Sequence, residues 1–268
     1  SALLTEGRVT CYHQDFNISP APYWQAADAE DRVGMSEIRH IEGVYAFWDE
    51  LLARHPGLII DNCAAGGRRI DLETISRSVP LWRSDVQEAP DFDLVAMQIQ
   101  THGLAFWVPL SAGYCNCTDT YAFRSGLSAG MVLDWSSRAL EKRLGFDLDC
   151  ARKLLAEFKA ARPYFYGDFY PLVSFSAAQD TWSAWQFHRP DLGEGMVLAL
   201  RRPSSPFTML EAALCGLDPE VRYEWRNADT GELGVASGRE LLEDGIPIEI
   251  AEKPGSTLLF YRRLPAHS

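Results

Sequence analysis

The stretch Val9-Thr10-Cys11-Tyr12-His13-Gln14-Asp15-Phe16-Asn17 decides how this sequence folds, because a short apolar run ends in a cluster of polar side chains. We expect a buried strand over Val9 to Tyr12, with His13 and Asp15 at its carboxyl end. Polar residues at the ends of successive strands, with helices between the strands, are typical of a parallel α/β barrel. The stretch therefore predicts a βα unit with functional side chains at its tip.

Two later stretches repeat this arrangement. The apolar run 58–60 precedes Asp61-Asn62-Cys63-Ala64-Ala65-Gly66-Gly67-Arg68-Arg69-Ile70-Asp71, and the run 79–82 leads into Trp82-Arg83-Ser84-Asp85. If both runs are strands of one parallel sheet, Asp15 and Asp85 converge at the same edge. Two convergent carboxyl groups are the minimal equipment for cleaving a glycosidic bond. Taken alone, however, an aspartate at a strand end more often caps the next helix or pairs with an arginine.

The alternation of predicted strands and helices continues to about residue 170. We expect helices over 36–52, 71–78, 92–101 and 148–162, further strands over 105–108 and 130–133, and a loop at Pro20 and Pro22. Five βα-like units are fewer than the eight strands of a closed barrel, and an open parallel sheet would leave unpaired edges. Either the chain is the later part of a longer barrel, or copies of it associate to cover those edges.

After Pro171 the pattern changes to strands separated by turn signals. We expect strands over 182–188, 196–201, 220–227 and 256–262, with hairpin turns at 192–195 and 229–232. The predicted fold class is therefore α/β: a partial TIM (β/α)8 barrel over residues 1–170, followed by an antiparallel, all-β sandwich domain over residues 171–268.

Composition narrows the possible partners and cofactors. The net charge of −12 argues against nucleic acid and anionic membranes, and no apolar run is long enough to span a bilayer. The six cysteines lack zinc-site spacing, so we expect reduced thiols in the cytoplasm. His13 and Asp15 are too few ligands for a metal, and Gly66-Gly67 lacks the spacing of a phosphate loop. The sequence thus predicts no metal and no cofactor.

The three motifs, in this order, resemble those of the clan-D α-galactosidases of glycoside hydrolase family 36. The resemblance is carried by His13-Gln14-Asp15-Phe16-Asn17, by Cys63-Ala64-Ala65-Gly66-Gly67-Arg68 and by Trp82-Arg83-Ser84-Asp85, and it covers roughly residues 1–170. It implies a retaining exo-glycosidase that releases terminal α-galactosyl residues from oligosaccharides. Asp15 would be its nucleophile and Asp85 its general acid/base.

The resemblance also implies a set of substrate contacts. Cys63 would face the sugar near its 4-hydroxyl, Asn17 would donate to the 2-hydroxyl, and the two glycines would let the backbone approach the ring. The implied substrate-binding residues are His13, Asn17, Cys63, Gly66, Gly67, Arg68 and Trp82.

The chain departs from the family pattern in two ways. His13 stands where family members carry lysine or arginine, and the first three barrel strands, which supply an acidic pair for the 4- and 6-hydroxyls, have no counterpart here. Two readings stay open: a homo-oligomeric α-galactosidase, or a catalytically incomplete fragment that binds sugar or needs a partner chain. Within the clan, β-L-arabinopyranosides and α-N-acetylgalactosaminides are alternative substrates.

Overall fold

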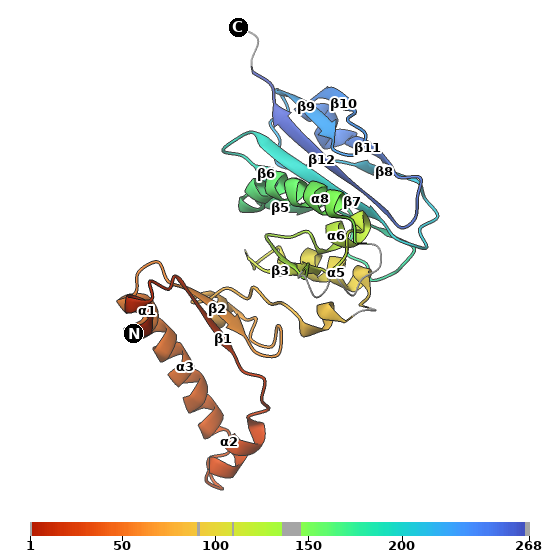
Figure 1. Cartoon of the computed structure of the whole chain (residues 1–268). Coiled ribbons are helices and arrows are strands. Elements are labelled where there is room, and N and C mark those ends of the chain that lie inside the picture. The colour runs from red at the N-terminus through yellow and green to blue at the C-terminus, as the bar shows by residue number, and fades with distance from the viewer. Residues whose placement is uncertain (1, 90–91, 109, 136–145, 266–268) are drawn as a thin grey trace. The chain divides into compact units, whose positions relative to one another are not determined.

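The computed structural model describes residues 2–89, 92–108, 110–135 and 146–265. The chain divides into two compact units, residues 1–86 (unit 1) and residues 87–268 (unit 2), coloured from red to blue along the chain in Figure 1. The domain boundary expected at residue 170, between a barrel domain and a β-sandwich domain, stays a prediction.

Unit 1 is a two-stranded parallel sheet with helices. Its elements are α1 (Ala2–Glu6), β1 (Cys11–Asp15), α2 (Ala21–Ala27), α3 (Met35–Arg54), β2 (Ile59–Cys63) and α4 (Leu72–Ile75), followed by the short helix η1 (Asp85–Glu88) that begins at its end. β1 and β2 pair in register from Cys11 opposite Ile59 to Asp15 opposite Cys63. Consequently the polar ends of both strands meet at one edge of the sheet.

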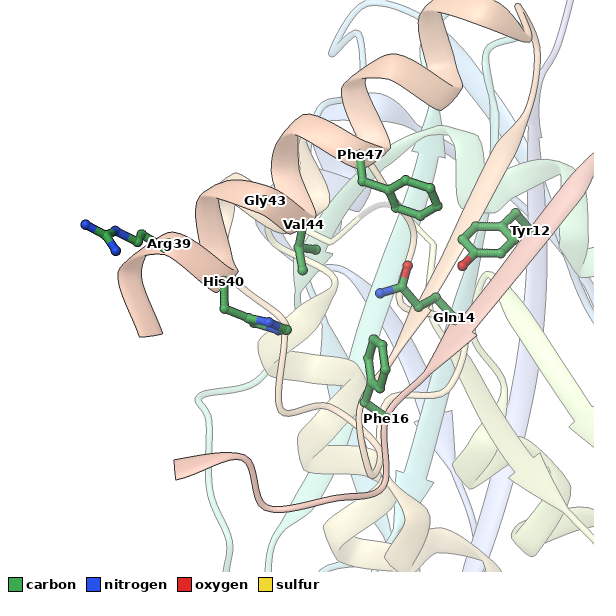
Figure 2. A pocket seen from close by; sticks show the side chains of 8 residues that line it. All are labelled: Tyr12, Gln14, Phe16, Arg39, His40, Gly43, Val44 and Phe47. Atoms are coloured by element: carbon green, nitrogen blue, oxygen red, sulfur yellow. The ribbon is translucent and has the colours of Figure 1, made fainter. Parts of the chain in front are cut away.

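Side-chain alternation along β1 separates two faces of unit 1. Tyr12, Gln14 and Phe16 point toward α3, where they line a cavity of about 350 Å³ with Arg39, His40, Gly43, Val44 and Phe47 (Figure 2). The indole Nε1 of Trp48, which is fully buried in α3, donates to Gln14 Oε1 over 2.7 Å. This bond shows that the face of β1 with Gln14 packs against α3, so Cys11, His13 and Asp15 belong to the opposite face.

Unit 2 begins with a second parallel strand pair and its helices. These elements are α5 (Leu94–Leu104), β3 (Ala112–Cys115), α6 (Thr120–Gly126), β4 (Gly130–Leu133), α8 (Leu148–Ala161) and η2 (Arg162–Tyr166). β3 pairs with β4 in parallel, from Ala112 opposite Gly130 to Cys115 opposite Leu133.

The rest of unit 2 is antiparallel. A six-stranded sheet has the order β10-β9-β12-β7-β6-β5, and β8 pairs with β11 in a separate two-stranded sheet. The bounds are β5 (Asp168–Pro171), β6 (Trp182–Arg189), β7 (Glu194–Arg201), β8 (Met209–Ala212), β9 (Arg222–Asn227), β10 (Leu233–Ser237), α9 (Gly238–Glu243), β11 (Ile246–Glu249) and β12 (Gly255–Arg263). The predicted antiparallel organisation after Pro171 is thus confirmed. The turn expected at 229–232 lies between β9 and β10, whereas the turn between β6 and β7 is at 190–193, two residues earlier than the expected 192–195.

The central strands of the large sheet are buried on both faces. One face of β7, with Leu198 and Leu200, packs in a core that includes Phe123 of α6 and Leu154 of α8. The other face belongs to a core that includes β8, β11 and α9. Burial on both faces explains why β7 reads as a continuous apolar run instead of alternating.

A buried arginine joins the helices of unit 2 to this sheet. The side chain of Arg124, at the end of α6, is only 2% exposed and bonds Glu157 of α8 and Asp229 of the β9–β10 turn, each at 2.6 Å. Arg124 Nη1 also donates to the carbonyl oxygen of Ser256 in β12. These two carboxylates raise the pKa of the guanidinium although burial opposes its charge.

Three expected elements differ from the structure. The expected strand over 79–82 is reduced to isolated bridge residues at Val79 and Trp82, because Pro80 has no N–H with which to continue a ladder. The apolar run 105–108 closes the end of α5, where Val108 N–H donates to Leu104 O, and the strand follows at β3 instead. The expected loop at Pro20 and Pro22 contains α2, whose first turn tolerates proline.

Candidate active site

The candidate site lies where β1 and β2 end. Asp15 is the last residue of β1 and is exposed, and its Oδ2 accepts a 2.7 Å hydrogen bond from Asn17 Nδ2. The N–H of Ala65 donates to Asn17 Oδ1 at 3.0 Å and to Asp15 Oδ1 at 3.4 Å. A backbone amide and a side-chain amide therefore both present N–H groups to one carboxylate.

These contacts keep Asp15 ionised. The small burial of its carboxyl raises the pKa, but the hydrogen bonds from Asn17, from the Ala65 N–H and from the Cys63 thiol lower it, and the net pKa lies below the ordinary 3.8. Asp15 is thus a carboxylate at neutral pH, which is the state that a nucleophile requires.

The turn after β2 connects Asp15 with Asp85. Ala65 has a φ of +46° and Gly66 a φ of +76°, so the chain reverses sharply after Cys63. A Cβ on Gly66 would lie 2.7 Å from the Asp85 backbone nitrogen, and a Cβ on Gly67 would lie 2.5 Å from the Arg83 carbonyl oxygen. Only glycine allows this approach, so the two glycines let the turn pack directly against the backbone that carries Asp85.

Cys63 is close to both carboxylates. Its thiol is buried near the Gly66 carbonyl oxygen, at 3.9 Å. Burial, together with the charges of Asp15 and Asp85, raises the pKa of Cys63 to about 11, so the thiol is neutral at physiological pH. Both carboxylates are therefore close enough to the Cys63 thiol to affect its pKa.

His13 is held by a residue that the motifs did not single out. Its Nδ1 lies 2.7 Å from Asp61 Oδ2, while Asp61 Oδ1 accepts the Leu81 N–H at 3.2 Å. Asp61 therefore ties β1 to the segment before Trp82 and orients the His13 ring, which is half exposed. Its position next to Asn62 at the end of an apolar run is the signal that could have marked it.

Of the two consecutive arginines, Arg69 is the one that turns back to the site. Arg69 Nη2 donates to the Cys63 carbonyl oxygen at 2.7 Å, and its guanidinium lies 5.2 Å from the centre of the Phe16 ring. Burial lowers the pKa of Arg69, and the nearby charge of Asp15 opposes that shift. The side chain of Arg68, the arginine of the motif, is exposed, and Trp82 is half-buried.

The structure thus gathers Asp15, Asn17, Cys63, Gly66, Gly67 and Asp85 around one turn, with His13 beside it. Asp85 is exposed, as are Asp15 and Asn17, so the site is open on this face of unit 1. Within the described ranges no three His, Cys, Asp or Glu side chains form a group that could hold a metal ion. In the same ranges no helix is long and apolar enough to cross a membrane.

Comparison with known proteins places this chain in a family. Alpha-galactosidase 1 of Pediococcus pentosaceus is 22% identical over 271 residues, which cover 97% of this chain and 35% of the relative. Alpha-galactosidase AgaA of Geobacillus stearothermophilus is 25% identical, covering 92% of this chain and 34% of the relative. The chain therefore spans about a third of the length of these relatives.

Solved structures show the same fold. The α-galactosidase of Lactobacillus brevis matches 99% of this chain and 37% of its own, with a TM-score of 0.74 and 19% identity. An AgaA variant in complex with stachyose matches 98% of this chain and 36% of its own, also with a TM-score of 0.74 and 19% identity. The sequence profile of the melibiase family matches residues 2–160, which is more than half of the chain. The resemblance read from the three motifs is thereby confirmed, and the chain belongs to the melibiase family.

Proposed function

We propose that this chain carries the catalytic pair of a retaining α-galactosidase, with Asp15 as nucleophile and Asp85 as general acid/base. The observation that carries the proposal is the turn after β2. Its Ala65 N–H binds Asp15 while its Gly66 backbone packs against Asp85. One turn thus contacts the carboxyl group of Asp15 and the backbone of Asp85, and in a retaining enzyme the two carboxyl groups are about 5–5.5 Å apart.

The reaction proceeds in two displacements. Asp15 attacks the anomeric carbon while Asp85 donates a proton to the departing glycosidic oxygen, and the sugar becomes covalently attached to Asp15. Asp85, now a carboxylate, takes a proton from water, and the water oxygen displaces Asp15 with overall retention of configuration. The lowered pKa of Asp15 supports its role in the first step, because only the ionised carboxylate can attack.

Terminal α-galactosyl groups of oligosaccharides are the proposed substrates. Variants of the similar enzyme AgaA were crystallised with raffinose and with stachyose. Beside the catalytic pair we propose His13, Asn17, Cys63, Gly66, Gly67, Arg68 and Trp82 as substrate contacts, and we add Arg69 because it lies next to Asp15 and Cys63. The six free thiols support the cytoplasmic location expected from the sequence.

Chemical rescue tests the assigned roles. The 268-residue chain is assayed with p-nitrophenyl α-D-galactopyranoside beside Asp15→Gly and Asp85→Gly, each with and without sodium azide. Azide should restore the Asp15 variant by replacing the nucleophile, giving the β-galactosyl azide. It should restore the Asp85 variant in the second displacement, giving the α-galactosyl azide. Full activity in either variant without azide would contradict the assigned roles.

A second candidate is that the chain becomes active only when another segment or subunit completes the site. Among the described residues β1 pairs only with β2, and apolar side chains beside it are open: Phe16 is 46%, Phe47 45% and Ile41 38% exposed. We propose that the strand pairs belong to a partial barrel and that homo-oligomer formation covers this edge. Sedimentation of an active but strictly monomeric chain would exclude the oligomer.

A further inference from the structure

His13 and Asp61 face each other across the parallel pair of β1 and β2. They are partners in the register of the two strands, and His13 Nδ1 lies 2.7 Å from Asp61 Oδ2. The next pair on the same face is Asp15 opposite Cys63, because alternate residues of a strand share a face. The pair of His13 and Asp61 therefore lies directly beside the proposed nucleophile.

Both oxygens of Asp61 accept hydrogen bonds. Oδ1 accepts the Leu81 N–H at 3.2 Å, which leaves Oδ2 for the imidazole of His13. An ionised carboxylate can only accept, and an imidazole nitrogen is a stronger base than a carboxylate. The proton between the two side chains consequently resides on His13 Nδ1.

This contact determines which nitrogen of His13 is left for a ligand. Nδ1–H is bonded to Asp61, so Nε2 is the remaining polar atom of a side chain that is 54% exposed. In the neutral ring Nε2 then carries a lone pair and no proton, so it can only accept. The charge of His13 contributes to the lowered pKa of Asp15, so the imidazole lies within electrostatic range of that carboxyl group.

We propose that Asp61 is a positioning residue, which holds His13 as the Nδ1–H tautomer so that Nε2 accepts a hydrogen bond from a hydroxyl group of the sugar. The inference rests on the proposed function, because the sugar must lie against Asp15 for Nε2 to reach it. It adds a direction to that contact: the sugar hydroxyl donates and the protein accepts. A ligand that has no donor at this position should bind less tightly.

A purely structural role for Asp61 would involve only one of its oxygens. Asp61 forms an isolated bridge with Val79, and its Oδ1 accepts from Leu81, so it joins β2 to the next segment of the chain. That role needs an acceptor at Oδ1 and leaves the tautomer of His13 unspecified. The two roles can therefore be separated by a substitution that changes Oδ2 alone.

Asp61→Asn is this substitution. The Leu81 N–H retains the amide oxygen as its acceptor, so the amide nitrogen faces His13 and donates to Nδ1, and the imidazole should switch to the Nε2–H tautomer. Nitrogen-15 NMR of the full chain, labelled at histidine, measures the tautomer, and the signals of His13 are identified by their loss in His13→Lys. The matched control Asp49→Asn removes a carboxylate of unit 1 that pairs with Arg77, and it should leave the tautomer unchanged.

Binding of galactose and of its 3-, 4- and 6-deoxy and deoxyfluoro derivatives, measured by NMR titration, tests the direction of the contact. Fluorine cannot donate a hydrogen bond and accepts one only weakly. In the parent chain, the deoxy and deoxyfluoro derivatives at one position should both bind about 3- to 10-fold less tightly than galactose, as expected for the loss of one hydrogen bond. In Asp61→Asn and in His13→Lys the side chain at position 13 donates instead, so there the deoxyfluoro derivative should bind more tightly than the deoxy derivative.

The inference is overturned if the parent chain shows the Nε2–H tautomer, or if its His13 ring stays protonated up to about pH 9, because Nε2 would then donate. It is also overturned if Asp61→Asn keeps the parent's tautomer and ranking of derivatives; with normal galactose binding, that result contradicts only the role of Asp61. No binding of galactose up to about 100 mM would overturn the contact with Nε2 together with the galactose specificity of the proposed function. The tautomer is measured without ligand or hydrolysis, so the two failures are distinguishable.

Discussion

Gly66→Ala is the substitution that tests most directly how the two aspartates are held together. The new methyl group would lie 2.7 Å from the Asp85 nitrogen and 2.9 Å from Ser84 Cα, in backbone at a φ of +76°. Left-handed backbone costs an alanine about 1–2 kcal/mol, and overpacking against rigid neighbours adds about 1–3 kcal/mol. We therefore expect Gly66→Ala to cost about 2–5 kcal/mol of the unfolding free energy of unit 1.

Gly57→Ala is the matched control, because Gly57 has a φ of +86° but no atom within 4 Å of its Cβ position. It should cost only the conformational part, about 1–2 kcal/mol. Urea denaturation gives the totals, and hydrogen exchange read by mass spectrometry localises them. Exchange should accelerate around residues 64–69 and 83–86 in Gly66→Ala, and the hydrolytic rate should fall by a further factor of about 100 if Asp85 moves by 1 Å. Equal losses in the two variants, without faster exchange near Asp85, would refute the packing argument.

Three further predictions concern single side chains. Asn17→Ala should raise the pKa of Asp15, because it removes a hydrogen bond that lowers this pKa, and NMR titration of the carboxyl carbon should give the raised value. The ionised carboxylate stabilises the fold above its unfolded pKa, and this contribution is lost as the pH falls through the lower folded pKa. In the variant the loss should be complete at a higher pH. Arg69→Ala should destabilise unit 1 by about 1–2 kcal/mol in urea, whereas Arg68→Ala should stay within about 0.5 kcal/mol, because only Arg69 bonds the Cys63 carbonyl; equal effects would contradict this assignment. Arg124→Met should cost about 3–5 kcal/mol, since it leaves two carboxylates uncompensated, while Arg152→Met at an exposed pair should cost at most about 1 kcal/mol; a small loss for Arg124→Met would show that the buried pairs are not needed.

Strong periodicity made the long elements predictable. The helical spacing of apolar residues located α3 and α8, and the short apolar runs before Asp15 and Cys63 located β1 and β2. The run 105–108 misled because a few apolar residues in a row fit a strand and the close of a buried helix equally well. Only the turn that follows α5 distinguishes these two possibilities, and that turn depends on three-dimensional packing.

The candidate site was predictable in its motifs but not in its internal contacts. Local pattern cannot distinguish Arg68 from Arg69, since which of two consecutive arginines turns inward depends on the backbone of the turn, where Arg69 reaches the Cys63 carbonyl oxygen. The packing of Gly66 on Asp85 joins segments 19 positions apart, and its signal in the sequence is only a pair of glycines. The family resemblance therefore implies sugar contact for these glycines, whereas in the structure both pack against the backbone of residues 83–85.

The buried arginine of α6 bears on how parts of such enzymes can be exchanged. Phe123 and Leu154, from helices, and Leu258, from β12, share one core, and Arg124 bonds partners in α8, in the β9–β10 turn and in β12. A chimaera that replaced the antiparallel sheet alone would have to supply a matching apolar face and a carboxylate at the position of Asp229. Recombination between relatives should therefore give folded protein more often when the crossover falls near residue 86, so that the helices of unit 2 are inherited together with their sheet.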